Sequence, residues 1–192
     1  IDKAGRAVNA GIAPHLNHRH TNEHSLAGYL WIEEHLKGAA FKMPATPKIA
    51  LNLASPDGIP RVSVTPDDSQ RVQRVDIYYS LDPHALTRFW RDAKAVKSDA
   101  QWQAECPVMS LDQPLFVFAN VAYETPPKYR AIPLMPGDGN SETFAISSRV
   151  LAVGPAQLQA AKVTPTDKPE RLIDDGARGW HDWYRLTWGH PT

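Results

Sequence analysis

The sequence predicts a mainly β fold: an immunoglobulin-like antiparallel β-sandwich preceded by a strand and a helix. From residue 49 onward, short runs of alternating apolar and polar residues are separated by turn residues, as is typical of sandwich strands. Before residue 39, apolar residues instead recur at helical spacing. The 17 prolines also favour turns and sheet edges over long helices, because proline fixes φ and lacks an amide donor.

Composition and charge exclude several classes of protein. The chain of 192 residues is 42% hydrophobic and 22% charged, which is typical of a globular protein. Lys and Arg together number 21, as do Asp and Glu, so no net charge attracts nucleic acid or an anionic membrane. No apolar run reaches the roughly 18 residues of a transmembrane helix. We therefore predict neither nucleic acid nor a membrane as a partner, and we expect the single cysteine, Cys106, to be a small buried residue.

Residues 1–38 form the first predicted unit, in which a strand, a histidine-rich turn and a helix follow one another. Leu26, Leu30 and their neighbours at helical spacing predict a helix over residues 23–37. Asn22 is the expected N-cap, because its side-chain oxygen can accept from an early helical amide. Gly38 is expected to end the helix in a left-handed conformation.

Residues 39–48 are expected to be a linker and residues 49–153 the β-sandwich domain. Prolines at two positions of the linker push the residues before them toward extended conformations. Alternating or continuously apolar runs predict strands at 49–53, 61–65, 72–79, 87–91, 101–106, 114–123 and 143–147. The run at 114–123 is almost entirely apolar, so we expect that strand to be buried on both faces.

Residues 154–192 are predicted to form a linker and the start of a further β element. The end of this segment is dense in Trp and Tyr, whose large apolar area water disfavours. Aromatic rings can stack on sugar faces, and paired carboxylates can bind sugar hydroxyls or calcium. The candidate binding residues are therefore Trp180, Trp183, Tyr184, Asp174 and Asp175. The same residues also fit a buried aromatic cluster beside a carboxylate turn, and both interpretations stay open.

Four histidines lie in the turn before the helix and at the start of the helix: His15, His18, His20 and His24. A neutral imidazole can take a proton from a serine hydroxyl and return it to a leaving group. That role needs a loop held by rigid elements on both sides, and we choose His18 as the base by its position in the loop, ahead of His20 and His15. A solvated polar loop is the alternative interpretation.

The spacing of His20 and His24, one helical turn apart, also suits two ligands of a metal ion. Glu23 does not directly follow the first histidine, however, and no third ligand is evident. We therefore predict no metal site and no cofactor.

The serine nucleophile of such a mechanism is missing from the chain. No Gly-x-Ser-x-Gly elbow occurs, and the nearest sequence, at residues 139–143, lacks the second glycine. In α/β-hydrolases the catalytic residues follow the chain order Ser, Asp or Glu, His, so both partners of His18 would precede it. We expect this chain to be inactive by itself.

The segments APHLNH at 13–18 and YLWIEEHLKG at 29–38 resemble the end of the catalytic domain of dienelactone-hydrolase-like or acetylxylan-esterase-like α/β-hydrolases. The accessory sandwiches that follow such domains are similar to residues 75–80, 88–91 and 114–121, and the start of a galactose-binding-like jelly roll resembles residues 171–184.

The resemblance implies a C-terminal fragment of a Ser-His-Asp esterase or peptidase, with the rest of the parent hydrolase as its partner. It implies His18 as the base, and acylated carbohydrates or other small esters as substrates. A non-catalytic carbohydrate- or protein-binding sandwich module is the alternative, and a purely structural domain is a third.

Overall fold

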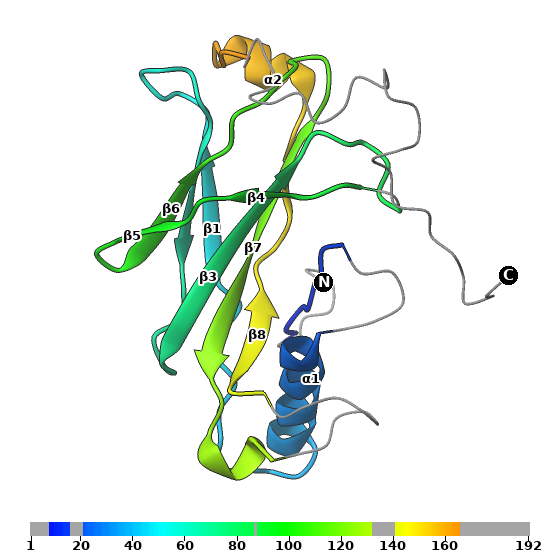
Figure 1. Ribbon diagram of the computed structural model, residues 1–192, viewed down its shortest axis with the longest axis vertical. Helices are drawn as coiled ribbons and strands as arrows, with labels where there is room; N and C mark the ends of the chain where they lie inside the picture. The colour runs from blue at the N-terminus through cyan, green and yellow to red at the C-terminus, as the bar shows by residue number, and fades with distance from the viewer. Residues whose placement is uncertain (1–7, 16–20, 87, 132–140, 166–192) are drawn as a thin grey trace, which may run out of the picture.

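Two antiparallel β-sheets form the body of the protein in a computed structural model, which describes residues 8–15, 21–86, 88–131 and 141–165 (Figure 1). The four-stranded sheet has the order β1 (Lys48–Asn52), β2 (Arg61–Thr65), β6 (Gln101–Glu105), β5 (Val96–Ser98). The five-stranded sheet has the order β4 (Arg91–Ala93), β3 (Val72–Ser80), β7 (Leu115–Glu124), β8 (Thr143–Ser147), and β9 (Leu151–Val153) also pairs with β7. The predicted mainly β fold is confirmed. The α/β-hydrolase part of the prediction is not shown, and residues 8–15 hold a single antiparallel bridge, from Ala10 to Ser147, where a strand was expected.

The burial of β3 and β7 follows the sequence pattern. In β3, the alternate residues Val75, Ile77 and Tyr79 are buried against the other sheet. Strand β7 is buried on both faces, as predicted, because each face meets a different layer. One face contributes to the core between the sheets, while Phe118 on the other stacks on Tyr78 and meets the edge of Trp90.

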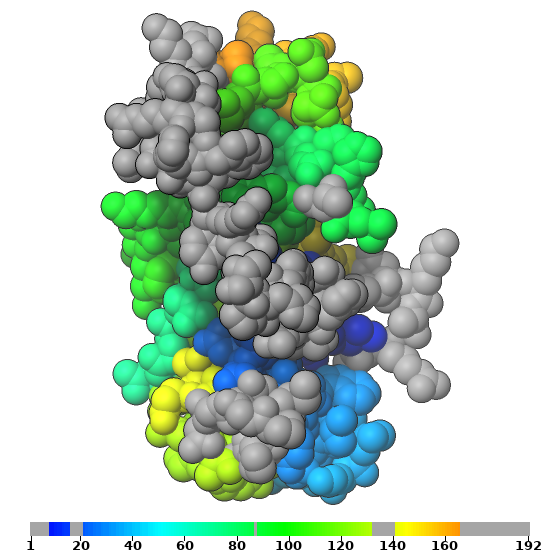
Figure 2. All heavy atoms as spheres, turned by 45° about the vertical axis from the view of Figure 1, so that its right-hand side comes forward, coloured from blue at the N-terminus to red at the C-terminus, as the bar shows by residue number. Residues whose placement is uncertain are grey.

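Helix α1 (Asn22–His35) packs against β8, which lies at the end of the strand order of the five-stranded sheet (Figure 1). It buries Leu26 and Leu30 completely or nearly so. The space-filling view shows its blue surface directly against the yellow residues of β8 (Figure 2). Neither this helix nor any other among the described residues has the length and apolar character needed to cross a membrane.

The ends of α1 differ slightly from the expectation. Its N-cap is Thr21 and not Asn22, because Thr21 has extended backbone angles and its hydroxyl oxygen accepts from the His24 amide at 3.3 Å. Gly38 has the predicted left-handed conformation, with a φ of 66°. The Ala39 amide beyond it donates back to the Glu33 carbonyl at 2.9 Å.

The segment after α1 packs along the sandwich before β1 begins. The Phe41 ring meets the rings of Phe144 and Tyr129 edge to face, with centroids 5.8 Å and 6.1 Å apart. The Met43 amide donates to the Glu34 carboxylate at 2.8 Å. The predicted linker therefore contacts both the sandwich core, through Phe41, and the helix, through Met43.

The strand predicted at residues 87–91 is wrong, since β4 begins only at Arg91. Before it, the Arg88 Nε donates to the Asp82 carbonyl at 2.8 Å and the guanidinium lies 3.5 Å from the centre of the Phe116 ring. These side-chain contacts stabilise the segment before β4 as a loop, whereas a strand there would be stabilised by backbone hydrogen bonds to a neighbouring strand.

Residues 154–165 also depart from the predicted linker. Residues Pro155–Ala160 form helix α2, which begins with proline at a position where its missing amide is no loss. The Leu158 side chain is completely buried in the core and Val163 nearly so. This segment closes one end of the sandwich, where the Thr164 amide donates to the Gly58 carbonyl at 2.9 Å.

Cys106, directly after β6, is completely buried as predicted. Burial raises the pKa of its thiol to about 12, because the thiolate is poorly solvated there. The unfolded chain releases this proton above about pH 8.5, so stability should fall as the pH rises from there toward the folded pKa. In urea denaturation at each pH, we expect the free energy of unfolding to fall by up to about 1.4 kcal/mol per pH unit more than in Cys106→Ala. Equal slopes in the two proteins would contradict the burial of an un-ionised thiol.

Candidate functional site

The extended segment ahead of the histidines is fixed to the edge of β8. The Ser147 amide donates to the Ala10 carbonyl at 2.8 Å, and the Ile12 amide donates to the Ser147 hydroxyl at 2.7 Å. The Asn120 side-chain amide donates to the Ile12 carbonyl at 3.0 Å and accepts from the Ser147 hydroxyl at 2.5 Å. Both polar groups of the Ile12 backbone are therefore held by two buried side chains, Asn120 and Ser147.

The first turn of α1 fixes the chain on the other side of the histidines. The Glu23 carboxylate accepts from the Thr143 hydroxyl and, at 2.8 Å, from Arg74 Nη2 on β3. The Thr21 hydroxyl lies 2.7 Å from His24 Nδ1. Hydrogen bonds to the same sheet thus hold the chain on both sides of residues 16–20.

His15 and the loop between β3 and β4 lie side by side. The His15 and Phe89 rings have centroids 5.2 Å apart. His15 has a φ of 63°, and Phe89 is 62% exposed. Trp90, next in the chain, is instead buried against Phe118. The contact between the histidine-bearing segment and the sandwich loop joins residues that are remote in the sequence.

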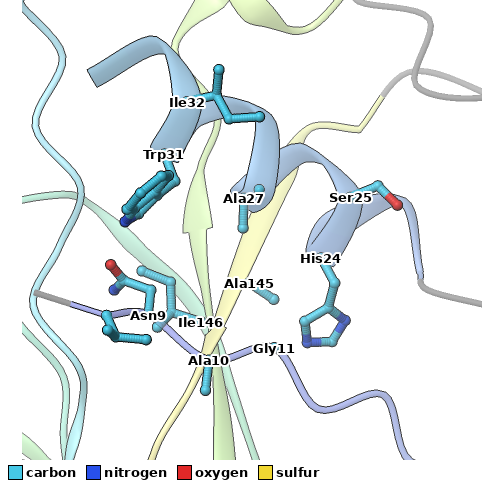
Figure 3. A pocket seen from close by; sticks show the side chains of 12 residues that line it. Asn9, Ala10, Gly11, His24, Ser25, Ala27, Trp31, Ile32, Ala145 and Ile146 are labelled. Carbon is cyan, nitrogen blue, oxygen red and sulfur yellow. The ribbon is translucent and has the colours of Figure 1, made fainter. Parts of the chain in front are cut away.

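A pocket of about 720 Å³ lies between α1, residues 8–11 and β8; we call it the α1 slot (Figure 3). Trp31 and His24 both extend from α1 toward the 8–11 segment, Trp31 near Asn9 and His24 near Gly11. The described residues that line the slot are Val8, Asn9, Ala10, Gly11, His24, Ser25, Ala27, Gly28, Trp31, Ile32, Ala145 and Ile146. Trp31 and His24 therefore stand toward opposite ends, with small residues between them.

The α1 slot is apolar. None of its described lining residues is Asp, Glu, Lys or Arg. The polar side-chain groups come from Asn9, Ser25, His24 and the indole N–H of Trp31, and the Asn9 amide already donates to the Pro44 carbonyl at 3.1 Å. In the ranges that the structure describes, no group of His, Cys, Asp and Glu side chains is placed to hold a metal ion.

The residues proposed from sequence as catalytic or binding groups lie outside the described part of the chain. This applies to His18, and also to Trp180, Trp183, Tyr184, Asp174 and Asp175, so their roles stay predictions. The alternative metal pair is not tested either, since His20 is outside the description while His24 lines the slot.

The α1 slot was not predicted from the sequence. A local signal for it is Gly28, a glycine inside a helix, where alanine would be favoured by about 1 kcal/mol. The spacing of His24, Ala27 and Trp31 also places them on one helix face. Neither signal identifies the opposite wall of the slot.

Comparison with known protein families, with curated protein sequences and with solved structures finds no match for this chain. Function is therefore inferred from residue chemistry and from the described geometry. Two features matter: the fixed chain on either side of residues 16–20, and the α1 slot, whose lining residues Gly11 and His24 flank the same segment.

Proposed function

We propose that this chain is the C-terminal part of a serine hydrolase of the esterase or peptidase type, with His18 as its general base. The sandwich is its immunoglobulin-like accessory domain. The observation that supports this best is the attachment of the chain to one sheet on both sides of residues 16–20. A general base needs such fixed flanks, because a small displacement of a catalytic group lowers the rate strongly.

The attachment on the upstream side depends on buried polar groups. Asn120 is 5% exposed and Ser147 is completely buried, so their hydrogen bonds to Ile12 are shielded from competing water. Ile12 lies six residues before His18. A buried network of this kind favours one arrangement of the segment that leads into the histidines.

The attachment on the downstream side is largely ionic. The Glu23 carboxylate joins the first turn of α1 to Arg74 of β3, which also binds Asp76 at 2.7 Å. The side-chain oxygen of Thr21 caps the N-terminus of this helix. Leu26, five residues further on, is almost completely buried. A negative side chain in the first turn is also favoured by the helix dipole.

In the proposed reaction, a serine of the parent hydrolase attacks the ester carbonyl and His18 accepts the hydroxyl proton. The tetrahedral oxyanion then collapses, and His18 returns the proton to the leaving alcohol. An acid ahead of His18 in the chain would orient its imidazole. Acylated carbohydrates or other small esters are the proposed substrates, in line with the resemblance described above.

The test compares the protein encoded by the complete reading frame with its His18→Ala variant in the hydrolysis of p-nitrophenyl acetate. We expect kcat/KM to fall by at least about 10³-fold, since the base takes part in both proton transfers. The matched variants His15→Ala and His20→Ala should keep most of the activity. All three histidine variants should have the same unfolding temperature as the unsubstituted protein.

The proposal also requires that a fluorophosphonate, which reacts with activated serines, labels the complete protein. Labelling should be lost in His18→Ala. A reading frame without a nucleophile elbow before residue 1, or a His18→Ala variant with full activity, would show that the hydrolase assignment is wrong.

A further inference from the structure

We infer that the α1 slot is a binding site for a small, uncharged aromatic molecule. This function is separate from the proposed hydrolysis and requires none of residues 16–20. Three properties of the slot lead to it: its size and aromatic ends, the absence of charge in its lining, and a glycine in its helical wall.

The size of the slot suits a ligand of one or two rings. Its volume of about 720 Å³ is within the range of small-molecule sites. His24 and Trp31 are seven residues apart on α1, which corresponds to about 10 Å along the helix axis. A bicyclic ring system fits this length, and the indole and imidazole at either end offer the offset or edge contacts that aromatic rings prefer.

The absence of Asp, Glu, Lys and Arg from the described lining of the slot favours an uncharged ligand. A charged group in the slot would lose water without meeting an opposite charge among the described lining residues. The nearest carboxylate in the sequence of α1, Glu23, is engaged by Arg74 and Thr143 on the sheet. An uncharged molecule therefore loses least on leaving water, and it gains most from contact with Ala27, Ile146 and Trp31.

Gly28 gives the helical wall an open surface. A Cβ atom at Gly28 would have no heavy atom within 4 Å, so the described structure holds nothing that excludes a side chain there. Glycine is nevertheless less favourable than alanine inside a helix. Its bare backbone allows a flat ring to approach the helix closely.

Gly11 on the opposite wall has a different role. A Cβ atom there would lie 3.0 Å from His24 Cδ2, so the absence of a side chain allows the imidazole to pack against the backbone. The glycine thus helps to hold His24 at its end of the slot.

The experiment measures binding of 6-propionyl-2-(dimethylamino)naphthalene, an uncharged bicyclic aromatic probe whose fluorescence rises and shifts to shorter wavelength in apolar surroundings, to the full chain. We expect saturable binding at one site per chain. Gly28→Phe places a ring in the slot and should raise Kd at least about tenfold, while Gly28→Ala should bind nearly as the parent does. Gln159→Phe adds the same ring to the exposed face of α2 and is the matched control for added hydrophobicity.

Two further measurements keep the test decisive. Gly28→Leu adds a smaller side chain and should give an intermediate Kd even if Gly28→Phe does not fold. Energy transfer from tryptophan to the probe should fall in Trp31→Phe, because Trp31 lines the slot. The inference is overturned if the chain binds no probe, or if folded Gly28→Phe and Gly28→Leu bind as the parent does. Failure here leaves the hydrolase proposal unaffected, because that proposal is judged by the activity of His18→Ala.

Discussion

Replacing Phe144 with alanine is expected to lower the free energy of unfolding by about 3–5 kcal/mol. Phe144 on β8 is completely buried, and its ring stacks on Tyr123 of β7 with centroids 5.5 Å apart. The same ring receives the edge of Phe41, from the segment that follows α1. The substitution therefore removes apolar contacts both within the sheet and between the sheet and the helical layer.

Urea denaturation followed by circular dichroism measures this loss. Phe89→Ala is the matched control, because Phe89 is 62% exposed and its truncation should change stability by less than about 0.5 kcal/mol. A loss of less than about 1 kcal/mol in Phe144→Ala would contradict the packing of the Phe144 ring against Tyr123 and Phe41.

Replacing Asn120 with alanine is the second substitution with a large expected effect, a loss of about 2–4 kcal/mol. Its amide donates to the Ile12 carbonyl at 3.0 Å and its carbonyl oxygen accepts from the Ser147 hydroxyl at 2.5 Å. Alanine leaves both groups without these partners in a site from which water is largely excluded. A buried polar group without a hydrogen bond costs about 1–3 kcal/mol.

The readouts are urea denaturation and hydrogen exchange at the Ile12 amide, which should exchange faster once the network is broken. Asn52→Ala is the control, since Asn52 is exposed and its side-chain oxygen accepts a hydrogen bond from the nearby Ala54 amide at 3.0 Å. In a double-mutant cycle, Asn120→Ala and Ser147→Ala should be non-additive by more than about 0.5 kcal/mol. Additive effects would contradict a shared network.

The sandwich strands were predictable because their signal is local. The alternation in β3 and the continuous apolar run of β7 follow directly from which faces these strands bury. The same local signals failed at α2, where Leu158 is buried in a core formed by distant strands. They also failed before β4, where Arg88 bonds to the backbone of Asp82 and covers Phe116.

The candidate site was predictable only in part. The order of extended segment, histidines and helix is visible in the sequence, because each element depends on neighbouring residues. The hydrogen bonds from Asn120 and Ser147 to Ile12 join positions more than 100 residues apart, and no local pattern indicates them.

The sequence by itself thus determined the β-sandwich character of residues 49–153, the helix after the histidines and the buried state of Cys106. These features are specified by apolar periodicity, by turn residues and by a glycine after the helix, which are all signals carried by residues close together in the sequence. The tertiary structure alone decided that α1 lies on β8 and that the α1 slot opens between them. The slot exists because residues 8–11, α1 and β8 pack together, and packing between remote segments depends on how their side chains fit in three dimensions.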